Sequence, residues 1–165
     1  WSSIWKSVFN NQILWSFRIN KWRNISLLRR NHRLHLFNSC GELYLQKRPA
    51  WKDIQPGRWD TAVGGHVDWG EEPLAALRRE VREEVGVTDF EPQHVLTYLF
   101  ESERERELVY VYKTVYDGPV VPSGELDGGR FWTLREIAEG VGGGIFTPNF
   151  EGEIRRVAEL PDVGR

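Results

Sequence analysis

The amino-acid sequence predicts an α/β fold in which a mixed β-sheet lies between helical layers. Short β-rich segments, separated by turn residues, alternate with fewer helical segments along residues 34–160. From Pro73 onward, one segment combines an apolar stripe at helical spacing with glutamates on another face. At 165 residues, the chain suits one domain with a sizeable core, and we find no internal repeat or second domain.

Strands are expected where β-branched and aromatic residues gather between turns. They cover residues 34–37, 42–46, 59–67, 94–100, 108–116 and 130–132. The turn at residues 38–41 joins the first two strands into a hairpin, and the charged residues 101–107 form a turn between the fourth and fifth strands. Helices are expected over residues 73–85, 134–139 and 149–160, with loops at residues 49–57 and 140–144.

The composition describes a soluble globular protein, because 40% of the residues are hydrophobic and 28% are charged. No apolar run approaches the roughly 20 residues that a transmembrane helix needs. The single cysteine, Cys40, cannot form an internal disulfide and fits a cytoplasmic location, where thiols stay reduced. The sequence leaves the oligomeric state open, with a homodimer as one option.

Residues 1–33 form a basic, tryptophan-rich segment of undetermined structure, ahead of a domain at residues 34–165. Residues 1–40 contain seven Lys or Arg and no acidic residue. The other 125 residues carry 15 basic and 24 acidic groups, a net charge of −9, which argues against binding of a nucleic-acid polymer. The apolar residues among the first nine follow helical spacing, so structural, targeting and membrane-surface roles stay open for this segment.

The segment from Pro73 to Gly86 predicts an amphipathic helix, with proline in its first turn and glycine as its C-cap. Its apolar stripe consists of Leu74, Leu77, Val81 and Val85. Another face gathers the carboxylates of Glu80, Glu83 and Glu84. Like charges this close repel one another unless a cation lies among them, and Mg²⁺ binds carboxylates and bridges substrate phosphates. The plainer alternative is a solvated acidic face.

This helix belongs to a longer pattern, residues 65–87, GHVDWGEEPLAALRREVREEVGV. With U a bulky aliphatic residue, it reads G-x5-E-x7-R-E-U-x-E-E-x-G-U and matches at all nine specified positions. The pattern resembles the Nudix box, the signature of hydrolases that cut diphosphate bonds with a bound divalent metal. The resemblance implies an α/β/α sandwich and a site for Mg²⁺, or Mn²⁺, formed by Glu80, Glu83, Glu84 and the Gly64 carbonyl. It also implies Glu80 or Glu83 as the general base, and Arg79 can orient Glu83 through an i,i+4 ion pair.

Residues upstream of the box resemble the family branch that contains isopentenyl-diphosphate isomerases and their hydrolase relatives. The stretch 52–59, KDIQPGRW, and the Gly-Gly-His at residues 64–66 carry this resemblance. It implies that Arg48 and Lys52 hold the substrate diphosphate and that His66 is a metal ligand. The plainer interpretations are solvated loop cations and a hydrogen-bonded turn histidine.

The resemblance to the isomerases also has limits. Glu105 and Glu107 match a glutamate pair that those enzymes use for metal binding and proton transfer, yet they also suit a solvent-exposed turn. Gly64 stands where the isomerases have a catalytic cysteine, and Arg29 stands where a further histidine is expected. Both departures weaken the prediction of isomerase activity.

Glu125 precedes the expected strand at residues 130–132, where many Nudix members carry an acidic residue near the metals. Together, the motifs predict a divalent-metal-dependent hydrolase that cleaves a small-molecule diphosphate, either a nucleoside diphosphate derivative or a related linked diphosphate, with metal-activated water. Two alternatives stay open. One is an isopentenyl-diphosphate isomerase-like enzyme, and the other is a domain that binds a nucleotide without cleaving it.

Overall fold

Seven strands form one mixed sheet in the computed structural model, which describes residues 28–101 and 106–162. The strands are β1 (Leu28–Phe37), β2 (Leu43–Lys47), β3 (Trp59–Thr61), β4 (Val63–His66), β5 (Gln93–Glu101), β6 (Arg106–Val115) and β7 (Gly129–Trp132). Their order is β3-β2-β1-β6-β5, with β4 paired to β1 and β7 paired to β2. The expected N-terminal amphipathic segment and Glu105 lie outside the described residues. The predicted α/β class with a mixed sheet is confirmed.

Strand β1 organises the sheet because it pairs with three other strands. It runs parallel to β6 over ten residue pairs and antiparallel to β2 and β4. The expected hairpin is confirmed, since the Asn38 N–H donates to the Glu42 carbonyl at 2.9 Å. β1 begins six residues before the expected start at residue 34, because its first half pairs with β4 and β6 from distant parts of the chain.

The prediction of a single strand at residues 59–67 is wrong, because the chain forms two short strands there. β3 pairs with β2, whereas β4 pairs with β1. The fully buried Ala62 lies between them, where the chain passes from one partner strand to the other. This change of partner strand places Gly64 and Gly65 of β4 beside the middle of β1.

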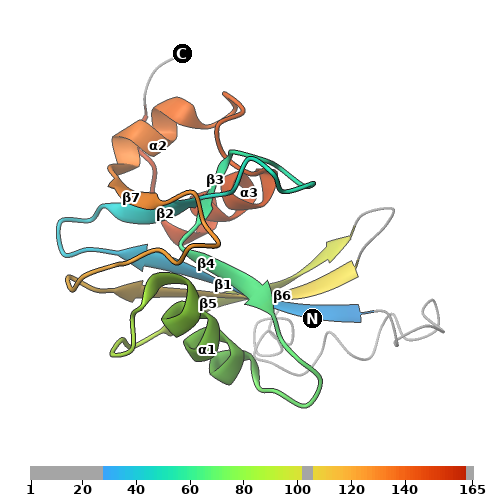
Figure 1. Cartoon of the computed structure of the whole chain (residues 1–165). Helices are drawn as coiled ribbons and strands as arrows, with labels where there is room; N and C mark the ends of the chain where they lie inside the picture. Colours follow the sequence, from blue (N-terminus) through green and yellow to red (C-terminus); the bar gives the residue numbers. More distant parts are fainter. Residues whose placement is uncertain (1–27, 102–105, 163–165) are drawn as a thin grey trace, which may run out of the picture.

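One face of the sheet is covered by α1 (Pro73–Val85), which lies on the opposite side from α2 and α3 (Figure 1). Ala76, Leu77, Val81 and Val85 are buried in this layer. Leu74 was expected in the stripe but is 42% exposed, because the first turn of α1 extends beyond the core. Gly86 ends the helix as predicted, with a left-handed φ of 69° and its N–H donating to the Arg82 carbonyl at 3.2 Å.

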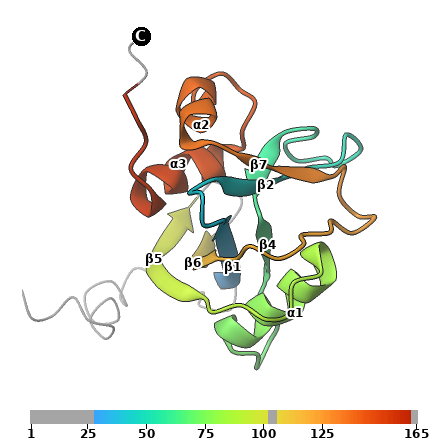
Figure 2. The same ribbon diagram turned by 90° about the vertical axis from the view of Figure 1, so that its left-hand side faces the viewer.

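The other face carries α2 (Leu134–Gly140) and α3 (Pro148–Val157), as Figures 1 and 2 show. Thr133 and Glu136 form a reciprocal capping box at the start of α2. Helix α3 ends three residues before the expected residue 160, since Ala158 adopts an extended conformation. No helix in residues 28–101 and 106–162 is long and apolar enough to cross a membrane.

A buried polar network joins α3 to the sheet. One Glu153 carboxylate oxygen lies 3.0 Å from His35 Nε2, and the other lies 3.2 Å from Arg33 Nε and accepts a hydrogen bond from the Tyr98 hydroxyl. Arg33 also pairs with Asp60 at 3.4 Å. Burial alone would raise the pKa of Glu153, but the His35 hydrogen bond and the Arg33 charge hold it below its ordinary value.

Candidate active site

The first part of the site is a close contact between α1 and the backbone of β4. A Cβ added at Gly65 would stand 3.1 Å from Glu80 Cγ and Cδ and 3.2 Å from His32 Nε2. Glycine is therefore required for Glu80 and the fully buried His32 to approach this strand together. Burial and the positive charge of Arg79 lower the pKa of His32 to about 4, so its imidazole is neutral at pH 7.

Arg79 is the second part of the site, because its guanidinium forms hydrogen bonds with two carboxylates and lies within 4 Å of two more, one of which is Asp68 at 3.8 Å. Its Nε and Nη2 donate to the two carboxylate oxygens of Glu71 at 3.2 and 3.1 Å. Its Nη1 donates to Glu80 at 2.6 Å and lies 3.6 Å from Glu83. The expected pair with Glu83 is thus present, but it is looser than the contacts with Glu71 and Glu80. Hydrogen bonding from Arg79 lowers the pKa of Glu71.

Glu84 is the third part of the site and, unlike Glu80 and Glu83, forms no ion pair within the part of the chain that the structure describes. Its Oε2 is buried and has no hydrogen-bond partner among the described residues. Burial and then repulsion from Glu80, Glu125 and Asp60 raise the pKa of Glu84 to about 8, while the positive charge of Lys52 opposes the shift. Several negative charges therefore converge on this carboxyl group, with one nearby cation acting against them.

The loop that leads to β7 brings Glu125 to this end of α1. The Ser123 N–H donates to the Glu84 carbonyl at 2.7 Å, and the Val121 N–H donates to the Val85 carbonyl at 3.0 Å. These bonds use carbonyls at the helix end that have no partner within the helix. Glu125 is therefore held near Glu84, and the charges of Glu125 and Lys52 both act on the Glu84 carboxyl group.

The donor set suits a divalent cation. Magnesium favours carboxylate and carbonyl oxygens. The buried Oε2 of Glu84, which lies among like charges, would gain stability from a cation beside it. Across residues 28–101 and 106–162, however, no three His, Cys, Asp or Glu side chains stand in an arrangement that would hold a metal as they lie. The reason is Arg79, which draws Glu80 and Glu83 toward its guanidinium. Metal binding would require these two side chains to turn toward Glu84.

The two predicted phosphate-binding cations have different surroundings. Arg48 braces its own loop, because its Nε and Nη2 donate to the Ile54 carbonyl at 3.2 and 2.8 Å. Its Nη1 lies 3.8 Å from Asp60. Lys52 is exposed, with its Nζ 4.9 Å from the centre of the Trp51 ring. Lys52 is therefore better placed than Arg48 to meet a ligand.

His66 and Glu107 do not join the helix glutamates. Side chains alternate between the faces of a strand, so His66 points away from the α1 side, to which its neighbour Gly65 is turned. Glu107 shares a face of β6 with Val109 and Val111, which pack against α3 rather than α1. The structure thus separates Glu107 from Glu80, Glu83 and Glu84 by the thickness of the sheet.

Gly64 differs from Gly65 in the space around it. A Cβ at Gly64 would meet the His32 carbonyl oxygen at 3.8 Å and side-chain carbons of Arg33 and Thr61 at 3.9 Å, which are ordinary contacts. The position occupied by cysteine in the isomerases is therefore open to a side chain. The lack of a cysteine at position 64 therefore removes a reactive thiol, but the space around Gly64 does not require it.

Sequence reasoning missed two residues of this region. Asp60 contributes to the charge around Glu84, and His32 lies against Gly65. The alternation of His32 with Leu34 and Leu36, both fully buried, was a usable signal that this histidine faces the core. No signal in the sequence connected Asp60 with the glutamate helix, because that contact depends on how β3 is placed.

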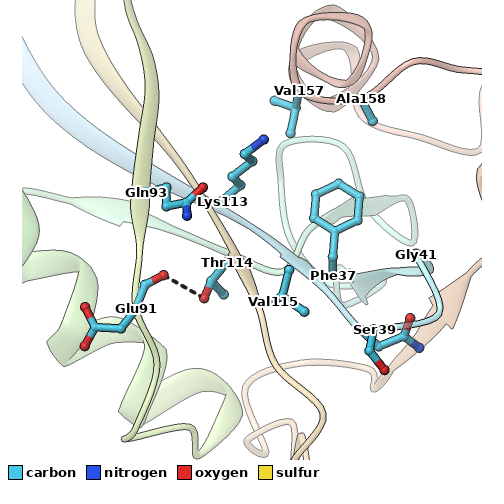
Figure 3. Close-up of a pocket in the computed structure, with 11 residues that line it drawn as sticks. Phe37, Ser39, Gly41, Glu91, Gln93, Lys113, Thr114, Val115, Val157 and Ala158 are labelled. Carbon is cyan, nitrogen blue, oxygen red and sulfur yellow. Dashed lines mark hydrogen bonds between the residues drawn. The ribbon is translucent and has the colours of Figure 1, made fainter.

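A separate pocket of about 580 Å³ opens at the far end of β1 (Figure 3). Its lining includes Phe37, Lys113 and Val157, and Thr114 donates a hydrogen bond there to the Glu91 carbonyl at 3.0 Å. None of the sequence-predicted site residues lines it. The convergent carboxylates, and not this hollow, define the candidate active site, because chemistry requires reactive groups as well as space.

Comparisons with known proteins agree with the resemblance of residues 65–87 to the Nudix box. A model of the NUDIX domain matches residues 28–150, so the chain belongs to the Nudix family. It is 34% identical over 110 residues to the "Uncharacterized Nudix hydrolase PA4841" of Pseudomonas aeruginosa, covering 66% of this chain and 65% of that protein. It is 31% identical over 118 residues to an isopentenyl-diphosphate Delta-isomerase of Serratia proteamaculans, covering 68% and 64%. The matched regions thus span less than two thirds of these relatives.

The fold has a solved counterpart. The crystal structure of DR0079 from Deinococcus radiodurans aligns with a TM-score of 0.68 and 25% sequence identity, covering 78% of this chain and 82% of that one. The predicted Nudix-type sandwich is confirmed by this similarity. Proteins of the family generally use divalent metals such as Mg²⁺.

Proposed function

We propose that this chain hydrolyses a diphosphate bond in a nucleoside diphosphate derivative or a related linked diphosphate, with Mg²⁺ (or Mn²⁺) as cofactor. The observation that carries the proposal is Oε2 of Glu84, which is buried near Glu80, Glu125 and Asp60 and has no hydrogen-bond partner among the described residues. A charge cluster of this kind gains stability from a divalent cation, and a diphosphate is the matching anionic ligand. Membership of the Nudix family supports the same reaction class.

Glu80, Glu83, Glu84 and the Gly64 carbonyl would hold the metal. When bound, such an ion would offset the negative charge of the diphosphate and would lower the pKa of a water molecule. Water attacks phosphorus, a P–O bond forms, and the bond to the bridging oxygen breaks. The proton passes to Glu80 or Glu83, of which Glu83 is the more accessible, at 53% side-chain exposure against 20% for Glu80.

The remaining residues of the site position these groups. Arg79 ties Glu80 to Glu71, so it orients the carboxylate that lies against β4. The neutral His32 lies on the same side of Gly65 as Glu80 and adds no positive charge there. Lys52, and Arg48 once it releases the Ile54 carbonyl, would offset the negative charge of the diphosphate.

The test is turnover of a substrate panel by the purified chain. Nucleoside diphosphates, nucleoside triphosphates, sugar nucleotides and prenyl diphosphates are incubated with Mg²⁺ or with a chelator, and the products are identified by phosphorus NMR. We expect Mg²⁺-dependent cleavage of at least one linked diphosphate. If nucleotides raise the melting temperature but none of them is cleaved, the chain is a binding domain and the hydrolase proposal fails.

An isomerase-like activity is the second candidate, because several matched relatives are named isopentenyl-diphosphate Delta-isomerase. The absence of a thiol at Gly64 argues against it, while the space around Gly64 allows a direct test. We expect the wild-type chain not to isomerise isopentenyl diphosphate. Isomerisation by the wild type, without phosphate release, would replace the hydrolase proposal. Gain of isomerisation in Gly64→Cys alone would show that the rest of the isomerase site is present.

A further inference from the structure

His32, in the middle of β1, is a fully buried histidine with an unusual lack of partners. Neither its Nδ1 nor its Nε2 has a hydrogen-bond partner among the described residues. Most buried polar groups in folded proteins are hydrogen-bonded, and leaving one without a partner costs about 1–3 kcal/mol. His35, on the opposite face of the same strand, is satisfied through its Nε2, which lies 3.0 Å from Glu153. The fold therefore satisfies one buried imidazole and leaves the other open.

Gly65 places the ring of His32 beside Glu80. His32 and Gly65 are paired residues where β1 and β4 run antiparallel. A Cβ at Gly65 would lie 3.1 Å from Cδ of Glu80 and 3.2 Å from Nε2 of His32. The carboxylate carbon and the ring nitrogen thus border one small space, which glycine leaves open. Rotation of the Glu80 side chain can bring a carboxylate oxygen within the roughly 2.7–3.2 Å of an N–H···O hydrogen bond.

Arg30, the nearest cation on this face of β1, is directed away from His32. It lies two residues before His32, so the two side chains share a face of the strand. Its Nη2 donates to the carbonyls of Asp68 and Glu71, at 3.0 and 3.1 Å, in the turn before α1. Glu80 is therefore the acceptor that the structure places beside the ring.

Glu80 is turned toward Arg79 in this structure, since Nη1 of Arg79 donates to it at 2.6 Å. A carboxylate that leaves Arg79 to hold a cation through one oxygen has a second oxygen that accepts hydrogen bonds. A buried imidazole beside it can supply the donor. Partners of this kind orient metal-binding carboxylates, and their loss typically costs about 10- to 100-fold in metal affinity or activity.

We propose that His32 is a positioning residue for the metal site, whose Nε2–H donates a hydrogen bond to Glu80 once Glu80 turns from Arg79 toward Glu84. This inference rests on the proposed function and adds to its site a residue from outside α1. His32 acts through Glu80 and contacts neither the diphosphate nor the attacking water. Glycine at position 65 is part of the same arrangement, because a side chain there would stand between the two groups.

The test is the affinity for Mg²⁺, titrated by isothermal calorimetry into the wild type, His32→Leu and His32→Gln without any phosphate ligand. His32→Leu should raise Kd for Mg²⁺ by about 10- to 100-fold. Without metal it should be at least as stable as the wild type, because it removes two buried nitrogens that have no partner among the described residues. His32→Gln should bind Mg²⁺ nearly as the wild type does, since its amide keeps an N–H donor.

The matched control is His94→Leu, which makes the same chemical change at an exposed position of β5. Nε2 of His94 lies 2.8 Å from the Thr97 hydroxyl and not beside a glutamate of α1. This variant should bind Mg²⁺ as the wild type does. If His32→Leu remains folded and keeps the wild-type Kd, the inference is overturned. Equal weakening in His32→Gln and His32→Leu would also overturn it, because the amide donor would then be of no use.

Nitrogen-15 NMR of the ring gives a readout that packing alone would not move. With Mg²⁺ bound, Nε2 of His32 should carry the proton, and its chemical shift should change as Mg²⁺ is added. An unprotonated Nε2 in the Mg²⁺-bound protein would overturn the inference.

These measurements also separate the inference from the hydrolase proposal. Mg²⁺ binding that weakens in His32→Leu, in a chain that cleaves no diphosphate, would support the positioning role while the hydrolase proposal fails. Mg²⁺-dependent cleavage that is unchanged in His32→Leu would support the hydrolase and overturn the positioning role. A wild type that does not bind Mg²⁺ at all would overturn both.

Discussion

The contact between Gly65 and Glu80 predicts a specific effect of adding one methyl group. In Gly65→Ala, the new Cβ would lie 3.1 Å from two carbons of Glu80, whereas carbon atoms in good contact lie about 3.5–4.0 Å apart. Glu80 must therefore move by about 0.5 Å or more. A misplacement of about 1 Å in a catalytic arrangement can cost about 100-fold in rate, so we expect kcat to fall by about tenfold or more.

The folded state should tolerate this substitution. Gly65 has no positive φ, so alanine does not strain the backbone, and Glu80 can give way more easily than main-chain atoms. Overpacking costs typically about 1–3 kcal/mol, and Gly-to-Ala replacement recovers about 0.4–1 kcal/mol from the unfolded chain. We expect a loss of about 1 kcal/mol in the free energy of unfolding, measured by urea denaturation.

The assay is steady-state hydrolysis of whichever linked diphosphate the panel identifies, at saturating substrate. Gly152→Ala is the control, since a Cβ at this exposed position of α3 meets nothing within 4 Å. It should keep wild-type kcat. If Gly65→Ala keeps kcat within twofold of wild type while remaining folded, Glu80 does not act from the position assigned to it.

Two further predictions concern stability. Glu153→Gln should lower the free energy of unfolding at pH 7 by about 3 kcal/mol, because it leaves Arg33, whose side chain is only 11% exposed, with less negative charge around it. Since the folded state holds the pKa of Glu153 below its ordinary value, the stabilisation is present above that value, about pH 4.3, and is lost as pH falls through and below it. Denaturant titrations from pH 3 to 7 should therefore show a shallower acid loss in Glu153→Gln than in the exposed control Glu159→Gln, and equal slopes would contradict the assigned ion pair. Gly86→Ala should cost about 1–2 kcal/mol, because alanine resists the left-handed φ of 69° while its Cβ finds ordinary contacts. An unchanged urea midpoint for Gly86→Ala would contradict the cap.

The sequence predicted those features that depend on neighbouring residues. The span of α1 and its glycine cap follow from a local stripe and a local turn residue, and both are confirmed. Leu74 belongs to the same periodic stripe yet is exposed, because periodicity identifies a helix face but not where the packing partner ends. The division of residues 59–67 into β3 and β4 depends on a change of partner strand, which no local pattern records.

The candidate site, like the fold, could be predicted only where it depends on residues close together in the sequence. The glutamates of α1 share a face because of their spacing, and Glu125 and Lys52 lie close enough to act on the charge of Glu84. The contact of His32 with Gly65 depends on the antiparallel pairing of β1 with β4, across 33 positions of sequence. Likewise, Arg79 binds Glu71 more closely than Glu83 because the chain folds back through the turn before α1. These contacts are tertiary, and spacing within one helix could not reveal them.

The most direct test of Glu84 as a metal-binding catalytic residue compares Glu84→Gln with Glu72→Gln, which removes an exposed carboxylate at the N-cap of the same helix. Hydrolysis and the rise in melting temperature on adding Mg²⁺ are measured for both variants and the wild type. Glu84→Gln should lose at least 100-fold in kcat and lose the Mg²⁺-dependent rise. It should remain as stable as the wild type without metal, because the buried Oε2 that it replaces has no hydrogen-bond partner among the described residues. Glu72→Gln should match the wild type in both measurements. Full activity and full Mg²⁺ stabilisation in Glu84→Gln would contradict the assignment of this glutamate to the metal site.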